Sequence, residues 1–407
     1  MKGKIIKIIS ILIIILFSLG LFYGCNNNLD KVEKESKPSM EESRKILVES
    51  NKEYKIKDDF MIVGKIGDNN FLANNINNKK DLYKYNILNN NNSKITSVYE
   101  KEKFIDIIDS NEDWIVWVEH ESKIIDTNNL PFNWNIVSYN MKSGEKKLLE
   151  KSTFGSRNKG SIRYSYTPLD IKIHNNNVLY TRPYEEDGEL KIDIVVYNII
   201  NNKVKVLDTI SNIPENNIES ISISGNKVVW NKMSDCADGK ESPKYNFPYE
   251  KYNIFIYDLK TNKKEELRFD DKSLYYSVKI YNNYISLIKV FEEREFYSEL
   301  IIYNLDNREV EIIAGEKEKI YNKDNTDTLK GNQIINENYI GWSEDGNGNL
   351  YVYDRANNSF IDLMSKSKNE YEENYSTGNI YNIWGNYIYV LGADKDGYQI
   401  NSIYKLK

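Results

Sequence analysis

The segment NIFIYDLKTNKKEEL, residues 253–267, decides the fold because it describes a β-hairpin and recurs along the chain. An apolar run ends at Tyr257, and a polar turn follows around Asp258 and Asn262. Alternation of polar and apolar side chains then resumes toward Leu267. This alternation has the period of a strand with one buried face, and Asn and Asp favour turns. The segment therefore predicts two antiparallel strands joined by a short turn.

Related segments occur in most parts of the chain after its N-terminal region. Four begin as follows: NIVSYNMKSGEKKLL at Asn135, DIVVYNIINNKVKVL at Asp193, ELIIYNLDNREVEII at Glu299 and NLYVYDRANNSFIDL at Asn349. Aligned on the tyrosine that ends the apolar run, the repeat occurs at Tyr85, Tyr139, Tyr197, Tyr257, Tyr303, Tyr353 and Tyr404. Successive tyrosines are 54, 58, 60, 46, 50 and 51 residues apart. A period near 50 indicates a propeller or a solenoid of strand units.

Each repeat contains two further strands before the tyrosine strand and one after it. The two strands before Tyr257 are IESISIS (218–224) and NKVVWNKM (226–233), and KVKVLD (203–208) is an example of the strand that follows a tyrosine strand, here that of Tyr197. Gly- and Asn-rich turns lie between the strands. Such turns supply the positive φ that a tight hairpin demands. Seven units of four antiparallel strands predict an all-β, seven-bladed β-propeller, with six or eight blades as the nearest alternatives. We expect the repeated tyrosines to be structural and to fill one site between neighbouring blades.

The ends of the repeat region predict how the ring closes. The last unit stops at Lys407, directly after its tyrosine strand, and lacks a fourth strand. Before the first unit lies EYKIKDD, residues 53–59, a strand without a partner. Pairing of this segment with the strand of Tyr404 would complete the last blade, which leaves no long edge open to aggregation. The propeller is thus expected to span residues 53–407.

The N-terminal segment is typical of an export signal. Three lysines, Lys2, Lys4 and Lys7, precede the apolar run of residues 8–23, and Gly24 and Cys25 follow. A charged region, an apolar region and a small residue before the cleavage point define a secretory signal peptide.

The end of this segment resembles the lipobox of bacterial lipoproteins, although Phe22 and Tyr23 stand where that family favours Leu and a small residue. The resemblance implies a signal peptide over residues 1–24, a diacylglyceryl anchor on Cys25 and a polar tether over residues 25–52. The alternative is an uncleaved membrane anchor. Either interpretation predicts a protein held at the cell membrane on its extracytoplasmic side.

Composition excludes several kinds of site. The net charge is −6, and removal of Lys2, Lys4 and Lys7 with the signal peptide leaves −9. An acidic chain without a basic block is a poor binder of nucleic acid. If Cys25 is acylated, the second cysteine, Cys236, has no partner for an intrachain disulfide. With two histidines in the chain, a Cys/His zinc site is not expected either.

No sequence motif of catalysis is present. The chain lacks a Gly-rich phosphate loop, a G-x-S-x-G elbow and an H-E-x-x-H pair. We predict structural rather than catalytic roles for His120 and His174. The stretch DGNGN, residues 345–349, lacks the sixth-position Gly and the distant Glu of a calcium loop. We therefore predict a protein without enzymatic activity, cofactor or metal.

At the level of strand pattern, residues 53–407 resemble TolB-like propellers, and more distantly the propellers of prolyl oligopeptidase-type peptidases. The Ser-Pro-Asp-Gly turn typical of TolB blades is missing from the chain. The resemblance implies a shared architecture and carries no partner with it.

Loop length distinguishes the two faces of the predicted ring. Connections from second to third strands and from fourth to first strands emerge on one face, here called the long-loop face. The long insertions fall there: 119–134, 151–168, 182–190 and 233–252. Long loops tend to carry function, and aromatic and Arg side chains anchor interfaces. The predicted binding residues are Trp134, Arg163, Tyr166, Arg182, Tyr184, Phe247 and Tyr249. They predict a module that binds an envelope protein or peptide; the alternative is a propeller that binds carbohydrate or acts on a cell-wall polysaccharide.

Overall fold

The computed structural model describes residues 52–121, 133–152, 170–187, 189–211, 218–234, 251–269, 273–291, 298–315, 330–344, 350–363, 375–394 and 399–406. The regular elements in these ranges are all β-strands. Within the same ranges, no helix is long and apolar enough to cross a membrane. Cys25 and the segments expected as signal peptide and tether lie outside the described residues, so the lipid anchor stays a prediction.

The described strands form seven four-stranded antiparallel sheets, which we call blades 1 to 7. Blade 1 has β2 (Phe60–Lys65), β3 (Asn70–Asn75), β4 (Asp81–Asn86) and β5 (Asn91–Ser97). Blade 2 has β6 (Phe104–Ser110), β7 (Trp114–His120), β8 (Trp134–Asn140) and β9 (Lys146–Lys151). Blade 3 has β10 (Ile171–His174), β11 (Asn177–Glu186), β12 (Glu189–Asn198) and β13 (Lys203–Ile210). Blade 4 has β14 (Ile218–Ser224), β15 (Lys227–Ser234), β16 (Lys251–Asp258) and β17 (Lys263–Leu267).

The remaining blades follow the same order. Blade 5 has β18 (Leu274–Tyr281), β19 (Tyr284–Val290), β20 (Ser298–Asn304) and β21 (Val310–Ala314). Blade 6 has β22 (Lys330–Ile335), β23 (Tyr339–Glu344), β24 (Leu350–Asp354) and β25 (Ser359–Asp362). Blade 7 has β26 (Tyr375–Trp384), β27 (Tyr387–Asp394), β28 (Gln399–Lys405) and β1 (Lys52–Lys55).

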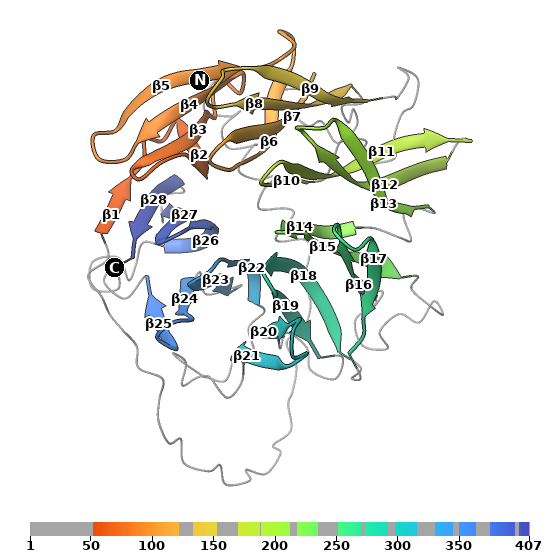
Figure 1. Cartoon of the computed structure of the whole chain (residues 1–407). Helices are drawn as coiled ribbons and strands as arrows, with labels where there is room; N and C mark the ends of the chain where they lie inside the picture. The colour runs from red at the N-terminus through yellow and green to blue at the C-terminus, as the bar shows by residue number, and fades with distance from the viewer. Residues whose placement is uncertain are drawn as a thin grey trace, which may run out of the picture. The chain divides into compact units, whose positions relative to one another are not determined.

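The blades form a ring with the first strand of each blade innermost, which confirms the predicted seven-bladed β-propeller. Figure 1 shows β2, β6, β10, β14, β18, β22 and β26 around the centre of the ring. From β2 round to β26, each of these strands contacts the first strand of the next blade. The fourth strands β5, β9, β13, β17, β21 and β25 make their main contacts with the third strand of their own blade and lie at the rim.

The ring closes through β1, as the sequence predicts. This strand pairs antiparallel with β28, with Lys52 opposite Lys405 and Lys55 opposite Ser402. The Ser402 hydroxyl also donates a hydrogen bond of 2.7 Å to the Glu53 carboxylate. The strand ends at Lys55, earlier than the expected 53–59 segment, because the following residues turn into β2.

The repeated tyrosines close the hairpins between third and fourth strands. In four blades the phenol lies 2.6–3.4 Å from the side-chain oxygen of the asparagine five residues later: Tyr85–Asn90, Tyr197–Asn202, Tyr257–Asn262 and Tyr353–Asn358. These asparagines have positive φ, between 47° and 59°. Asparagine tolerates this left-handed region better than most residues, so one side chain serves both turn and tyrosine.

A lysine from the preceding blade joins this arrangement at two blade boundaries. Lys147 on β9 donates to Asn202 and lies 5.6 Å from the centre of the Tyr197 ring. Lys205 on β13 donates to Asn262 and lies 4.6 Å from the Tyr257 ring. Ammonium groups over aromatic faces attract the ring quadrupole. For the four tyrosines that contact an asparagine in this way, the expected structural role is confirmed.

Apolar side chains between adjacent blades form the core. One cluster joins Leu179 and Ile194 of blade 3 to Val228 and Trp230 of blade 4, and others lie at the other blade boundaries. Burial of both faces of most sheets explains why strands such as VVYN and IIYN contain successive apolar residues.

The strand bounds show the expected difference between the two faces of the ring. Turns between first and second strands and between third and fourth strands are two to five residues long; we call their side the short-turn face. Longer connections, among them those after β7, β9, β15, β21 and β25, all join second to third or fourth to first strands. The predicted long insertion at 182–190 is wrong, because most of that segment extends β11 and β12, which only two residues join. The longest segments of the propeller outside strands therefore belong to the long-loop face.

Candidate functional site

Three of the predicted binding residues lie within the described ranges. Trp134 opens β8 and is 1% exposed, within the apolar cluster between blades 2 and 3. Arg182 and Tyr184 lie on β11 and are half-buried. Trp134 therefore belongs to the core in this structure. The other predicted binding residues, Arg163, Tyr166, Phe247 and Tyr249, lie outside the described residues, and their role stays a prediction.

Arg182 links two blades through a pair of carboxylates. Its guanidinium lies 2.6 Å from Asp193 on β12 and 3.4 Å from Glu150 on β9. Burial opposes the charge of Arg182, but the hydrogen bond and charge of Asp193 outweigh it and raise the arginine pKa. Asp193 also accepts a 2.7 Å bond from Thr209, and Glu150 a 2.9 Å bond from Tyr180. These contacts fix Arg182 in place and explain its position structurally.

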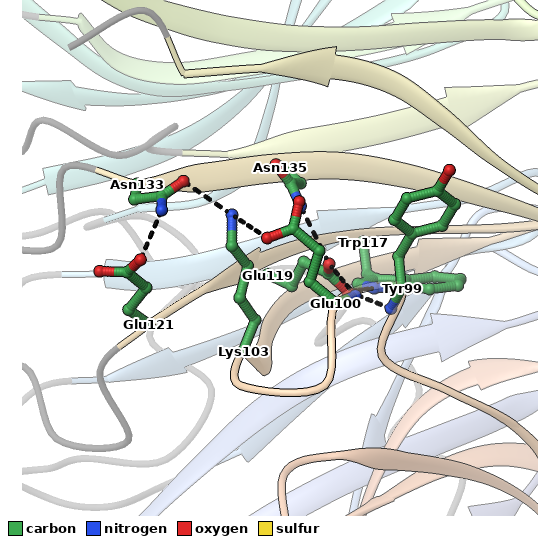
Figure 2. Close-up of polar contacts among 8 residues, drawn as sticks. All are labelled: Tyr99, Glu100, Lys103, Trp117, Glu119, Glu121, Asn133 and Asn135. Carbon is green, nitrogen blue, oxygen red and sulfur yellow. Dashed lines mark hydrogen bonds and ion pairs between the residues drawn. The ribbon is translucent and has the colours of Figure 1, made fainter. Parts of the chain in front are cut away.

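A buried carboxylate lies at the long-loop end of blade 2 (Figure 2). Glu119 on β7 is fully buried and accepts four hydrogen bonds. Two come from the backbone N–H groups of Tyr99 and Glu100, at 2.7 and 3.0 Å. Two come from the Trp117 indole and the Asn135 amide, both at 3.1 Å. These four donors are shared between both oxygens of the carboxylate.

Lys103 lies beside this carboxylate and is 1% exposed (Figure 2). Its ammonium donates to Asn133 at 2.9 Å and lies 3.4 Å from the Glu100 carboxylate. Burial lowers the pKa of Lys103, and the charges of Glu100 and Glu119 act against that shift. Glu119 and Lys103 together hold the connection between β5 and β6 against β7 and β8. With their contacts filled, they have no free group to offer a ligand.

A second set of charged groups lies on the innermost strands. Asp106 and Asp109 belong to β6, Asp170 precedes β10, Lys172 lies on β10, Glu219 on β14 and Lys279 on β18. Tyr381, on the innermost strand β26, is 50% exposed. Burial nevertheless raises the pKa of its phenol, and Asp106 adds to this shift. We call the region around these side chains on the innermost strands, at the centre of the ring, the axial channel.

Lys172 is neutralised within the channel. Its ammonium forms a 2.8 Å ion pair with Asp170, whose carboxylate also accepts a bond from the Ile171 backbone. Burial acts against the charge of Lys172, but Asp170 and Asp109 outweigh it and raise its pKa. Asp109 in turn accepts a 2.8 Å bond from the Ile173 backbone, and burial raises the pKa of Asp109. This group joins blades 2 and 3.

Lys279 differs from Lys172 in having no counterion among the described residues. Among the described residues, none is hydrogen-bonded or ion-paired to its ammonium. Burial lowers the pKa of Lys279, and the positive charge of Lys172 lowers it further, while the negative charges of Asp170 and Glu219 act in the opposite direction. The Glu219 carboxylate is already bound to Asn231 and to the Ser277 backbone.

The described residues contain one acid–histidine contact. His120 Nε2 lies 3.3 Å from Asp106 Oδ2. Burial acts to raise the pKa of Asp106, but the bond to His120 outweighs it and leaves that pKa lowered. Among the described residues, no serine hydroxyl is hydrogen-bonded to this histidine. The described His, Cys, Asp and Glu side chains form no group of three able to hold a metal ion.

Sequence reasoning missed Glu119, Lys103 and Lys279. One signal for two of them was visible: Glu119 follows the apolar run WIVWV, and Lys279 interrupts the strand YSVKIY. A lone charge inside a strand that is otherwise apolar marks either a buried polar network or a functional group. The contacts that separate these two outcomes come from other blades or distant loops.

Comparison with known proteins shows similarity of fold. No protein-family model and no curated protein sequence matches the chain. The β-propeller domain of the Trilobed protease from Pyrococcus furiosus has a TM-score of 0.53 at 10% identity, covering 87% of this chain and 94% of that chain. YCF48 bound to D1 peptide has a TM-score of 0.51 at 9% identity, covering 90% and 100%. The chain is thus a seven-bladed β-propeller, a fold that serves many functions.

TolB from Acinetobacter baumannii is also similar, with a TM-score of 0.38 at 11% identity over 83% of this chain and 63% of that chain. The propeller architecture implied by the resemblance to TolB-like proteins is confirmed by the seven blades themselves.

Proposed function

We propose that the chain is an extracytoplasmic lipoprotein, anchored in the cell membrane through Cys25, whose propeller binds a protein or peptide on its long-loop face. The observation that supports a binding module is the one-sided placement of the long connections on a ring closed at β1. A rigid ring that holds several long loops on one face suits docking of a partner. Peptide binding also has a precedent on this fold, since YCF48 is recorded bound to D1 peptide.

The anchor is tested by metabolic labelling of cells with a fatty-acid probe. We expect label on the full-length protein and none on a Cys25→Ala variant, because acylation needs the thiol. Two acyl chains give a stable anchor where one gives a reversible one. Equal labelling of both proteins would refute the anchor.

The binding face is tested by capture of partners from membranes with the full-length protein, tagged after Lys407 and solubilised in mild detergent. The test variant combines Arg163→Ala, Tyr166→Ala, Phe247→Ala and Tyr249→Ala. The control variant combines Leu88→Ala and Ile200→Ala, at short-turn positions that are 57% and 65% exposed. Partners lost from the test variant alone support the long-loop face. Loss from the control variant alone places binding on the other face, and turnover of a cell-wall polysaccharide by the protein would favour the enzymatic alternative.

A further inference from the structure

Backbone hydrogen bonds fix the position of Lys279 in the axial channel, and its ammonium takes no part in them. β18 carries a β-bulge between Tyr276 and Lys279, with Ser277 at a φ of 53°. A bulge of this kind turns the following side chain to a new direction. The backbone N–H groups of Val278 and Ile280, on either side of Lys279, donate to Ser220 and Ser222 of β14 at 2.9 and 3.1 Å. The backbone around Lys279 is therefore fixed independently of its charge.

The charges of Asp170 and Glu219 favour the ammonium of Lys279, but neither acid forms an ion pair with it. Asp170 is paired with Lys172, and Glu219 is bound to Asn231 and Ser277. An ammonium taken partly out of water without a partner carries an uncompensated desolvation cost. A structural lysine would be expected to have this cost offset within the protein, as it is at Lys103 and Lys172. A bound anion would offset it at Lys279.

We propose that the axial channel binds a carboxylate group at Lys279. A monoanion fits better than phosphate, because the site offers one free positive charge and lies near Asp170 and Glu219, which repel a dianion more strongly. Lys279 lies two residues before the end of β18, and Lys172 two before the end of β10. Since first strands run toward the short-turn face, this site lies nearer that face, away from the predicted partner surface. The inference therefore goes beyond the proposed function and does not depend on it.

Calorimetric titration of the full-length protein in detergent micelles tests the proposal. The probes are N-acetyl-dialanine, which ends in a carboxylate, its C-terminal amide, N-acetyl-glutamate α-amide with a side-chain carboxylate, and acetate. We expect one or more carboxylates to bind and the uncharged amide not to bind. Binding of N-acetyl-dialanine alone would identify the ligand as the carboxylate of a chain terminus. Binding of the glutamate probe would identify it as a side-chain carboxylate, and binding of acetate alone as a small acid. Each of these outcomes supports the proposed site.

Variants locate the effect. Lys279→Gln should weaken carboxylate binding about tenfold or more, the value of one charge-assisted hydrogen bond. Lys279→Arg keeps the charge and should retain binding. Lys84→Gln removes the same charge from an exposed position on β4 and should leave binding unchanged. Circular dichroism melting verifies that each variant is folded. Failure of every carboxylate to bind, equal binding of acid and amide, or undiminished binding to Lys279→Gln would overturn the proposal.

Discussion

Lys103 in blade 2 and Lys279 in the axial channel are both desolvated, and burial lowers the pKa of each. Lys103 has an amide oxygen and a carboxylate at its ammonium, whereas Lys279 has neither among the described residues. The comparison teaches that burial of a charge does not by itself reveal its role. The ammonium of Lys103 has protein partners, which indicates a structural role. The ammonium of Lys279 has none among the described residues, and this difference is the basis of the proposed carboxylate site. Four predictions test this distinction.

The largest effect is expected for Glu119→Gln, at the centre of the filled network. The amide has one acceptor oxygen, so its NH₂ group meets two of the four N–H donors that now point at the carboxylate. We expect a loss of about 3 kcal/mol in the free energy of unfolding. Urea denaturation followed by tryptophan fluorescence measures it. Glu311→Gln, at an exposed position on β21 outside this network, is the control and should change stability by less than about 0.5 kcal/mol. Similar values for both variants would contradict a structural role for Glu119.

Lys103→Met should destabilise the protein less, by about 1–2 kcal/mol. Methionine fills a similar volume but leaves the Asn133 oxygen and the Glu100 carboxylate without their cation. The same denaturation experiment measures the change. A variant as stable as the wild type would show that the Lys103 contacts contribute nothing, and the comparison with Lys279 would fail.

Lys279→Met should stabilise the protein, in contrast to Lys103→Met, and raise the free energy of unfolding by about 1 kcal/mol. The substitution removes a desolvated charge that no described residue neutralises. The matched control is Lys84→Met, exposed on β4, which should stay within about 0.5 kcal/mol of the wild type. Destabilisation by Lys279→Met beyond the control would indicate a structural partner and remove the basis of the contrast.

The smallest expected effect is the pH dependence of that gain. The folded-state pKa of Lys279 lies below its usual value, so on raising the pH the folded protein loses this proton before the unfolded chain does. Wild-type stability therefore gains a contribution as the pH rises toward the unfolded-state pKa. The methionine variant lacks this contribution, and its advantage should shrink by several tenths of a kcal/mol between pH 7 and pH 10. A constant or growing advantage would contradict the lowered pKa.

Much of the fold follows from local patterns that the sequence states openly. The tyrosine repeat predicts the number of blades, and the unpaired strand near Glu53 predicts the closure, because both are properties of short segments. The Tyr-x₄-Asn spacing, as in Tyr257 and Asn262, was also present and could have predicted the left-handed turn residues.

The polar sites could be predicted much less well. Glu119 and Lys279 look alike in sequence, since each is a single charge beside apolar strand residues. What separates them is their contacts with other segments: the β5–β6 connection brings the N–H groups of Tyr99 and Glu100 to Glu119, whereas no described residue is bonded to the ammonium of Lys279. Trp134 shows the same limit, because an aromatic residue at the predicted edge of a long loop packs into the core.

The closure at β1 has a mechanical consequence. The strand that completes the ring is the first described segment after the N-terminus, and it pairs with β28 over four residues, from Lys52 opposite Lys405 to Lys55 opposite Ser402. Tension applied through the N-terminus therefore reaches this pairing before any other blade contact. The load would peel β1 from Lys52 onward while the apolar clusters between the other blades still hold. The strand that closes the ring and the point where force enters the described domain are therefore the same strand.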